Sequence, residues 1–368
     1  MKELRIKDIC DKGSSNLKQK DVEGKNGLYP VYGASGIISH IDTYHQEENY
    51  IAIVKDGSGI GRVTFMPAKS SVIGTMQYIL PKEGFNINYI GYCLQSLDLS
   101  KYKQGAAIPH IYFRDYGERI VKVTESINEQ QSIVDYIDSA FAKIDAMKAN
   151  AEKALNEAKV LFQASLKEML EPKEGWEEKT LKEITTKISD GSHNPPAGVD
   201  FSEYEMLSSK NLRNDYFNFD NPRFLSKEDF EKEDKRTNLE KGDVLLTIVG
   251  AGLGECCVYN FEKKIVFQRS VSVIKPSYDK ITSRFLMYTL QRNYNNIRNA
   301  SNGAAQKGIY LKQLAAYTVL LPPLSEQQSI VASLDSLKSK VDRLQENYDK
   351  ISQECDALKQ AILRQVFE

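Results

Sequence analysis

The sequence predicts an α+β chain with an internal two-fold repeat, in which two mixed α/β globules are joined by two long antiparallel coiled-coil helices. Three observations predict this fold. The phrase NEQQSIVDYIDS at residues 128–139 returns as SEQQSIVASLDS at residues 325–336. Each copy opens a heptad pattern of apolar residues, and each copy follows a long segment of globular composition.

The repeat extends well beyond that phrase. Residues 128–170 align with residues 325–367 without a gap, at a constant offset of 197 positions, and 17 of the 43 aligned residues are identical. Such a match indicates an internal duplication. We expect a first globule at residues 1–127, a central helix at 128–171, a second globule at 172–323 and a C-terminal helix at 324–368.

Both copies have the apolar spacing of a coiled-coil helix, alternating between four and three residues. The predicted seam of the first helix is Ile133, Ile137, Ala140, Ile144, Met147, Ala151, Ala154, Ala158 and Leu161. That of the second is Ile330, Leu334, Leu337, Val341, Leu344, Tyr348, Ile351, Cys355 and Leu358. Small residues in one seam and bulky ones in the other favour an antiparallel pair over helices that pack only on their own globules.

The helix ends also have sequence signals. Ser325 is a candidate N-cap, with Gln328 three residues later as in a capping box. Pro172 and Gly175 are expected to end the first helix. In the globules, short β-branched and aromatic runs predict strands, with one helix each around INYIGYCLQS and SRFLMYTLQR.

Composition sets broad limits. The 368 residues include 41% hydrophobic and 27% charged residues, enough for two folded domains. No apolar run approaches the roughly 20 residues of a membrane span, and no signal peptide is recognisable, so a cytoplasmic location is expected. Five scattered cysteines and four histidines predict neither a disulfide framework nor a structural zinc.

Net charge gives little indication of the partner. The chain carries a formal charge of -1, and the negative excess lies in the two helical segments. Because bulk attraction to phosphate is absent, any DNA-binding face must come from local clustering of cations.

Three motifs could indicate an enzyme, and each has a simpler interpretation. The glycine runs at residues 57–61 and 250–254 follow apolar strands, but the residues after them are β-like, which predicts hairpins and not cofactor loops. The NPPA sequence at Asn194 resembles an amino-methyltransferase motif, yet Ala197 replaces the aromatic residue that would stack on a base. His40, His45, His110 and His193 have no catalytic partner at informative spacing.

Polar, basic and aromatic stretches precede each long helix, and their recurrence favours nucleic-acid binding. Cations suit phosphates, whereas amides and guanidinium groups suit base edges. The candidate DNA-binding residues are Arg62, Lys101, Lys103, His110, Tyr112, Arg114, Lys210, Asn211, Arg269, Arg292, Arg298, Lys307, Tyr310 and Lys312.

The layout, with LPPLSEQQSI and INEQQSIV opening two long helices, resembles the specificity subunits of type I restriction-modification systems. The resemblance covers essentially the whole chain, although VTESINEQQ in the first half lacks both prolines. It implies two target-recognition domains that read the halves of a bipartite sequence in double-stranded DNA. It also implies two adenine-methylating modification subunits docked on the helices, with restriction subunits attached through them.

The resemblance further implies that this chain is not itself an enzyme and carries no cofactor, while S-adenosylmethionine and ATP are expected in the partner subunits. Divergence between the globules predicts an asymmetric target. The candidate partner-binding residues of the helices are Gln130, Gln131, Phe141, Phe162, Gln327 and Gln328. A coiled-coil adaptor or decoy that binds proteins but not DNA remains an alternative, and a self-contained methyltransferase is disfavoured by the altered NPPA.

Overall fold

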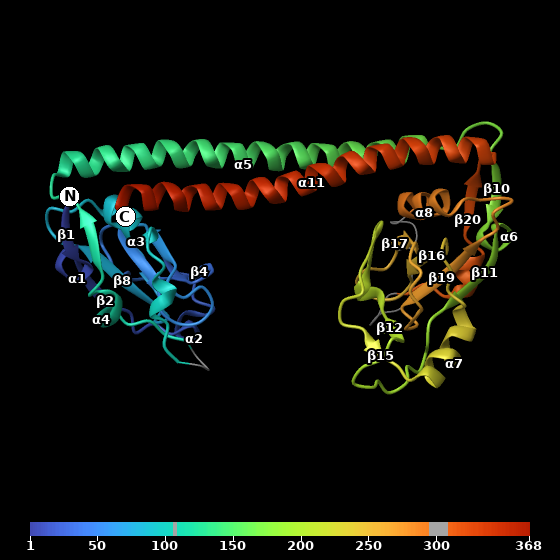
Figure 1. Ribbon diagram of the computed structural model, residues 1–368, viewed down its shortest axis with the longest axis horizontal. Coiled ribbons are helices and arrows are strands. Elements are labelled where there is room, and N and C mark those ends of the chain that lie inside the picture. Colours follow the sequence, from blue (N-terminus) through green and yellow to red (C-terminus); the bar gives the residue numbers. More distant parts are fainter. Residues whose placement is uncertain (106–108, 294–307) are drawn as a thin grey trace. The chain divides into compact units, whose positions relative to one another are not determined.

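A computed structural model describes residues 1–105, 109–293 and 308–368. The chain divides into two compact units (Figure 1). Unit 1 comprises Met1–Lys153 and Glu346–Glu368, and unit 2 comprises Ala154–Gln345. Each unit therefore contains one globule together with part of both long helices, and each is described by itself.

Unit 1 is built from two sheets and a short strand pair. A four-stranded antiparallel sheet has the order β2-β8-β5-β6, a three-stranded mixed sheet has the order β4-β3-β7, and β1 pairs with β9. The strands are β1 (Lys2–Arg5), β2 (Cys10–Ser14), β3 (Tyr29–Gly33), β4 (Gly36–Ile41), β5 (Tyr50–Val54), β6 (Val63–Met66), β7 (Ser71–Val72), β8 (Met76–Pro81) and β9 (Ile120–Val123). Every residue of β5 is buried, as expected for a continuous apolar run in a central strand.

Unit 2 repeats this strand order. Its four-stranded sheet is β11-β19-β16-β17, its mixed sheet is β15-β12-β18, and β10 pairs with β20. The strands are β10 (Glu177–Thr180), β11 (Thr185–Asp190), β12 (Glu205–Leu207), β13 (Leu212–Arg213), β14 (Tyr216–Phe217), β15 (Arg223–Phe224), β16 (Val244–Thr247), β17 (Cys256–Val258), β18 (Ile265–Phe267), β19 (Val271–Pro276) and β20 (Thr318–Leu321). The predicted internal repeat is thus confirmed in three dimensions.

Three short helices occupy matching positions in the two units. The short helices of unit 1 are α1 (Ile6–Ile9), α2 (Gln19–Val22), α3 (Ile87–Gln95), η1 (Leu99–Tyr102) and α4 (Phe113–Tyr116). Those of unit 2 are α6 (Leu181–Ile184), η2 (Ser209–Asn211), α7 (Lys227–Thr237), α8 (Ser283–Arg292) and α10 (Leu311–Ala315). Of these, α1 corresponds to α6, α3 to α8 and α4 to α10. The one helix predicted in each globule corresponds to α3 or α8, and each begins at a side-chain cap, Asn86 or Thr282.

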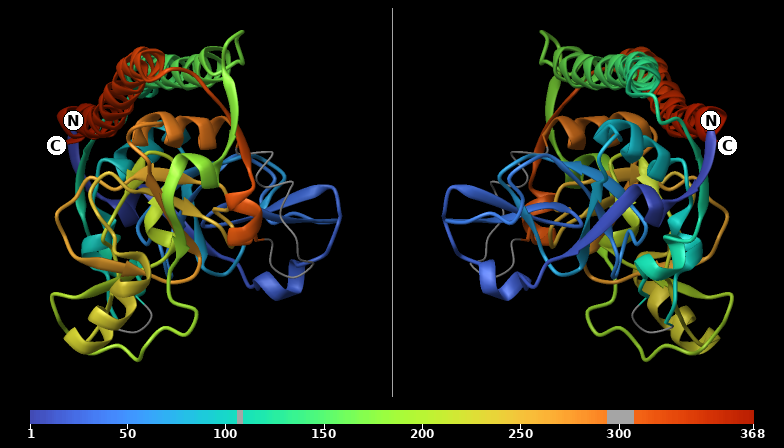
Figure 2. Two further views of the ribbon diagram at one scale, coloured as in Figure 1. Left: turned by 90° about the vertical axis from the view of Figure 1, so that its right-hand side faces the viewer. Right: turned by 90° about the vertical axis from the view of Figure 1, so that its left-hand side faces the viewer.

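Unit 2 also has elements of its own. The hairpin β13–β14 and the helix α7 have no counterpart among the described residues of unit 1. In Figures 1 and 2, α7 lies at the end of unit 2 opposite the long helices. The two globules therefore share a framework and differ in what is added to it.

The two long helices are α5 (Ile127–Met169) and α11 (Leu324–Phe367). They run antiparallel, since within unit 1 Asp145 pairs with Lys359 at 2.6 Å and Lys148 with Asp356 at 3.6 Å, so that residue numbers rise along one helix and fall along the other. The predicted antiparallel helix pair is confirmed.

The seam of the two long helices differs in part from the prediction. Met147, Ala154, Leu161 and Leu358 are exposed, whereas Leu155 and Phe162 are buried, so part of the seam is displaced by one residue. The reason is that both helices also pack on the globules. Val134, Ile137, Leu363 and Phe367 belong to the core of unit 1, while Phe162, Leu166, Ile330 and Leu334 belong to the core of unit 2.

The predicted cap is also wrong. Because α11 begins at Leu324, Ser325 lies inside the first turn, and the carbonyl oxygen of Pro323 accepts from the amides of Glu326 and Gln327. In α5, Ser126 takes the capping place and its Oγ accepts from the amide of Glu129 at 3.4 Å. The two copies therefore start their helices with different chemistry.

Candidate nucleic-acid interface

Two sequence features that were predicted separately lie together in each unit. The residues before each long helix contact the glycine hairpin that follows the buried central strand. In unit 1 the amide of Ile111 donates to the carbonyl oxygen of Lys55 at 3.0 Å. In unit 2 the amide of Ile309 donates to the carbonyl oxygen of Ile248 at 2.9 Å. Each unit thus has a surface formed by the hairpin and this loop, here called the hairpin–loop surface.

The glycine hairpins connect antiparallel strands, β5 with β6 and β16 with β17. Gly57, Gly59 and Gly61 have φ values from +80° to +84°, and Gly250 and Gly254 have +103° and +94°. Only glycine adopts this left-handed backbone readily. Since no helix begins after either run, the structure confirms the hairpins, and neither run has the geometry of a phosphate-binding loop.

Most first-half candidates surround the hairpin–loop surface of unit 1. Arg62 is exposed on the hairpin and donates to the carbonyl oxygen of Ala34. Lys101 and Lys103 are exposed, at η1 and just after it. A Cβ atom at Gly61 would collide with the backbone of η1, which shows how closely the hairpin approaches that helix.

An aromatic stack lies beside this hairpin. The rings of His110 and Tyr112 are 4.1 Å apart, and the guanidinium carbon of Arg114 lies 4.6 Å from the Tyr112 ring centroid. The Nδ1 of His110 hydrogen-bonds the carboxylate of Asp56 on the hairpin. His110 therefore has a partner 54 residues away in the chain, which sequence spacing did not indicate.

The second-half candidates are more dispersed. Lys210 and Arg269 are exposed, the latter in the turn between β18 and β19, and Tyr310 and Lys312 are exposed next to the hairpin–loop surface of unit 2. Arg298 and Lys307 lie outside the described residues.

For Asn211, the structure corrects the prediction of a DNA contact. Its side chain is buried, donates to Asn218 and Asp220 at 3.0 and 2.8 Å, and accepts from the amide of Ser208. With both its amide nitrogen and oxygen occupied, it holds its own turn and does not face a base.

The glutamines predicted to face partner proteins divide into two kinds. Gln130 and Gln327 are fully buried, and their side chains hold the globule to the helix. Gln130 Oε1 accepts from the amide of Asn86 at 2.7 Å, and Nε2 donates to the carbonyl oxygens of Gly84 and Thr124. This arrangement, here called the glutamine latch, corrects the prediction, because a fully buried side chain is not available to a partner.

Unit 2 repeats the glutamine latch. Gln327 Oε1 accepts from the amide of Thr282 at 3.0 Å, and Nε2 donates to Lys280 and Pro322. The neighbours Gln131 and Gln328 are exposed on the helices and stay candidates for partner contact. Phe162 is buried in the core of unit 2, which removes it as a partner contact, while Phe141 is half-buried beneath Lys359.

A second contact between globule and helix also recurs, but with different reinforcement. The hydroxyl of Tyr92 donates to Asp138, and that of Tyr288 donates to Asp335 at 2.6 Å. In unit 2 Arg284 also binds Asp335, and it reaches Asp215 at 2.6 Å. Burial opposes the charge of Arg284, but its hydrogen bond to Asp335 and the charge of Asp215 outweigh burial and raise the pKa of the guanidinium.

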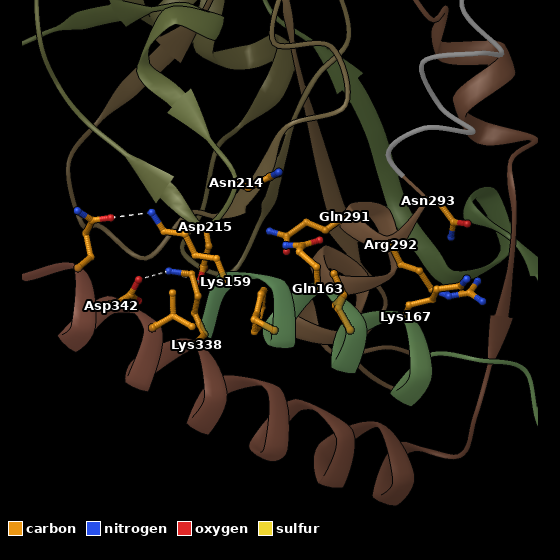
Figure 3. A pocket seen from close by; sticks show the side chains of 14 residues that line it. Lys159, Gln163, Lys167, Asn214, Asp215, Gln291, Arg292, Asn293, Lys338 and Asp342 are labelled. Carbon is orange, nitrogen blue, oxygen red and sulfur yellow. Dashed lines mark hydrogen bonds and ion pairs between the residues drawn. The ribbon is translucent and has the colours of Figure 1, made fainter. Parts of the chain in front are cut away.

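A cleft of about 790 Å³ lies next to this network (Figure 3). Gln163 and Lys167 of α5 and Lys338 and Asp342 of α11 line it, together with the end of α8. Arg292 is placed here, paired with Glu171 at 2.6 Å, and is not on the hairpin–loop surface. Its guanidinium therefore supports the helix contact in unit 2.

The cysteines, His193 and the NPPA loop all lie in defined local contacts. All five cysteines are buried, and burial raises the pKa of the Cys10, Cys93 and Cys257 thiols to about 12. His193 hydrogen-bonds Asp190 at 2.6 Å, a carboxylate that also binds Arg236. The NPPA loop is bound to the mixed sheet through Arg223, which donates to the Pro196 carbonyl.

Across residues 1–105, 109–293 and 308–368, no three His, Cys, Asp or Glu side chains group in a way that could hold a metal ion. None of the helices in these ranges has both the length and the apolar character that a membrane crossing requires.

Comparison with known proteins gives matches over both halves. The family model "Type I restriction modification DNA specificity domain" matches residues 1–157 and again 173–353. The chain is 26% identical over 268 residues to the type I restriction enzyme EcoBI specificity subunit of Escherichia coli, covering 65% of this chain and 56% of that protein. It is also 26% identical over 260 residues to the EcoKI specificity subunit of Escherichia coli strain K12, covering 65% and 55%.

The chain thus spans about half the length of the curated relatives it matches. Among solved structures, one from work on complex assembly and conformational transition of the type I R-M system aligns with a TM-score of 0.72. That alignment covers 98% of this chain and 96% of the other at 18% identity, so it shows a shared fold.

Proposed function

Because the chain belongs to the type I restriction-modification DNA specificity family, we propose that it is the sequence-reading subunit of such a system. In this role it binds double-stranded DNA through both globules and directs adenine methylation and restriction by partner subunits. The observation that carries the proposal is the double match of the family model, once over each repeat. Because such a subunit acts on cellular DNA, we propose that this chain is located in the cytoplasm.

A bipartite target follows from the repeat. Two globules with the same strand order each present a hairpin–loop surface with exposed cations, and this supports one half-site for each globule. The additional β13–β14 hairpin and α7 of unit 2 support different half-sites, because different side chains are then available to read bases. We therefore propose an asymmetric target.

The partner subunits would supply the chemistry. We propose that two modification subunits bind the long helices through exposed side chains such as Gln131 and Gln328, and that restriction subunits attach through them. S-adenosylmethionine and ATP would bind to those partners. Membership of the DNA specificity family supports a chain without turnover of its own.

Methylome sequencing of cells that express this chain with its modification subunits tests the proposal. We expect modified adenines in a two-part, non-palindromic motif. A palindromic motif would contradict the asymmetric target, and absence of any motif, together with no binding of the complex to duplex DNA, would favour an adaptor that binds only proteins.

Variants of single cations assign the half-sites. Lys210→Ala and Arg269→Ala should weaken or relax recognition of one half-site and leave the other unchanged, since both residues lie in unit 2. Arg62→Ala should affect the opposite half-site. Equal effects of all three variants on both half-sites would contradict the assignment of one half-site to each globule.

A further inference from the structure

One pair of exposed side chains is retained at the same place in both units. Tyr112 and Arg114 in unit 1 correspond to Tyr310 and Lys312 in unit 2, with one residue between tyrosine and cation in each case. Each tyrosine directly precedes a short helix, α4 or α10, with an extended backbone at φ −114° and ψ 137° or φ −83° and ψ 148°. We call each pair a tyrosine–cation pair.

The fold turns these tyrosines outward in both units. The residue before each one, Ile111 or Ile309, is buried, and its amide donates to the carbonyl oxygen of the residue that directly follows the central strand. Because side chains alternate faces along extended backbone, burial of the isoleucine directs the tyrosine to solvent. Tyr112 is 39% exposed and Tyr310 is 69% exposed, so both rings reach solvent.

The cation is exposed as well. The Arg114 side chain is 73% exposed, with its guanidinium over the Tyr112 ring and its Nε 3.5 Å from the Asp115 carboxylate, and Lys312 is exposed on α10. In unit 1 the ring and the cation are in contact, and in unit 2 both side chains are exposed two residues apart, so each unit offers a hydroxyl and a positive charge on the same short segment. This is the donor set that binds a phosphodiester oxygen.

Around the pairs the two units differ. The residue two positions before the tyrosine is His110 in unit 1 and Gly308 in unit 2. His110 pairs with Asp56 of its hairpin, and Gly308 pairs with Val249. Domains that read different half-sites need different side chains at base-reading positions. A position that keeps hydroxyl plus cation in both is suited to the part of DNA that does not vary with sequence, which is the phosphate backbone.

We propose that Tyr112 with Arg114, and Tyr310 with Lys312, bind the phosphate backbone at the two half-sites and do not read bases. The inference rests on the proposed DNA-binding function. Each tyrosine hydroxyl donates to a phosphate oxygen, and the adjacent cation neutralises that phosphate. The pairs set the position of each globule on the duplex, and the diverged residues beside them carry specificity.

Salt dependence of binding tests the proposal. The full chain in complex with its modification subunits is titrated with target and with random duplex, for Arg114→Ala, Lys312→Ala and the double variant. Each single variant should reduce the slope of log affinity against log salt by about 0.9, and the double variant by about 1.8. The loss should be the same for both duplexes, so that the ratio of specific to random affinity is unchanged.

A charge-conserving variant separates phosphate contact from base reading. Arg114→Lys keeps the cation but loses the planar fork that binds guanine, and the second unit already uses lysine at this place. We expect affinity within about twofold of the wild-type complex. A loss of about tenfold or more that depends on one base of the first half-site would overturn the proposal.

Arg119→Ala is the matched control, since Arg119 is an exposed arginine in the turn before β9 and not part of the pair. Its salt slope should equal that of the wild type. An unchanged slope for the paired variants as well would also overturn the proposal. Failure of the wild-type complex to bind DNA would instead remove the proposed function, so the two failures are distinguishable.

Discussion

In unit 1 the globule is held to the long helices by Gln130 and by the bond from Tyr92 to Asp138, whereas unit 2 adds Arg284 to the corresponding pair of contacts. Asn88 stands where unit 2 has Arg284, and it is exposed. The glutamine latch is therefore common to both copies and the charged network is not. The comparison shows that duplication preserved the glutamine latch and the tyrosine–aspartate bond, whereas the charged reinforcement by Arg284 is found in unit 2 and not at the corresponding Asn88.

Removing the latch should have the largest effect. In Gln130→Leu or Gln327→Leu the buried amide and two carbonyl groups lose their partner, and each unsatisfied group is costly. We expect each variant to lower the free energy of unfolding by about 3 kcal/mol, measured by urea denaturation of the full chain. The two values should agree, because the bonds are the same.

Gln328→Leu is the matched control, since it lies next to Gln327 but is exposed. Its unfolding free energy should stay within about 0.5 kcal/mol of the wild type. If the Gln328 variant were as unstable as the Gln327 variant, the latch would not be the cause.

Removing the charged network should break the symmetry between units. Arg284→Met removes the cation that binds both Asp215 and Asp335, and leaves Asp215 only the more distant Lys338 at 4.0 Å. We expect a loss of about 2 kcal/mol, seen by hydrogen exchange as faster opening of α8 and its neighbours in unit 2 alone. Asn88→Met, at the corresponding position of unit 1, should change exchange by little.

The smallest effect concerns the aromatic contact in unit 1. Lys359 lies 5.1 Å from the ring centroid of Phe141 and pairs with Asp145 at 2.6 Å. Both contacts are partly exposed, so Lys359→Met should cost only about 0.5 to 1 kcal/mol in urea unfolding. Lys340→Met, on an exposed position of the same helix, serves as the reference, and an equal loss there would show that neither contact contributes.

The repeat itself was predictable from sequence, because a gap-free match of 43 residues and a heptad period are visible without a structure. The glycine hairpins were also predictable, because β-like residues directly follow each glycine run. The seam was predicted only in part, because α5 and α11 pack both on each other and on the globules. The apolar residues of both contacts are mixed in one sequence pattern, which does not tell them apart. Leu155 and Phe162 were missed for this reason.

The candidate site was less predictable than the fold. Gln130 appeared to be a surface residue because glutamine is usually exposed, and its acceptor at Gly84 lies 46 residues away in the chain. Likewise the bond from His110 to Asp56 depends on how the hairpin folds back on the loop. Composition did identify the exposed tyrosines and cations, since their clustering before each helix is local.

The buried cysteines of β17 allow a different kind of measurement. Cys256 faces the core that includes α8, and its neighbour Cys257 faces the separate core that includes Phe267, because adjacent residues of a strand point to opposite sides. Burial raises the pKa of both thiols, so each reacts only after its own side opens. If each of the two is replaced with alanine in turn, the alkylation rate of the other reports how often the core on its side of β17 opens. One strand then reports local unfolding of two separate cores.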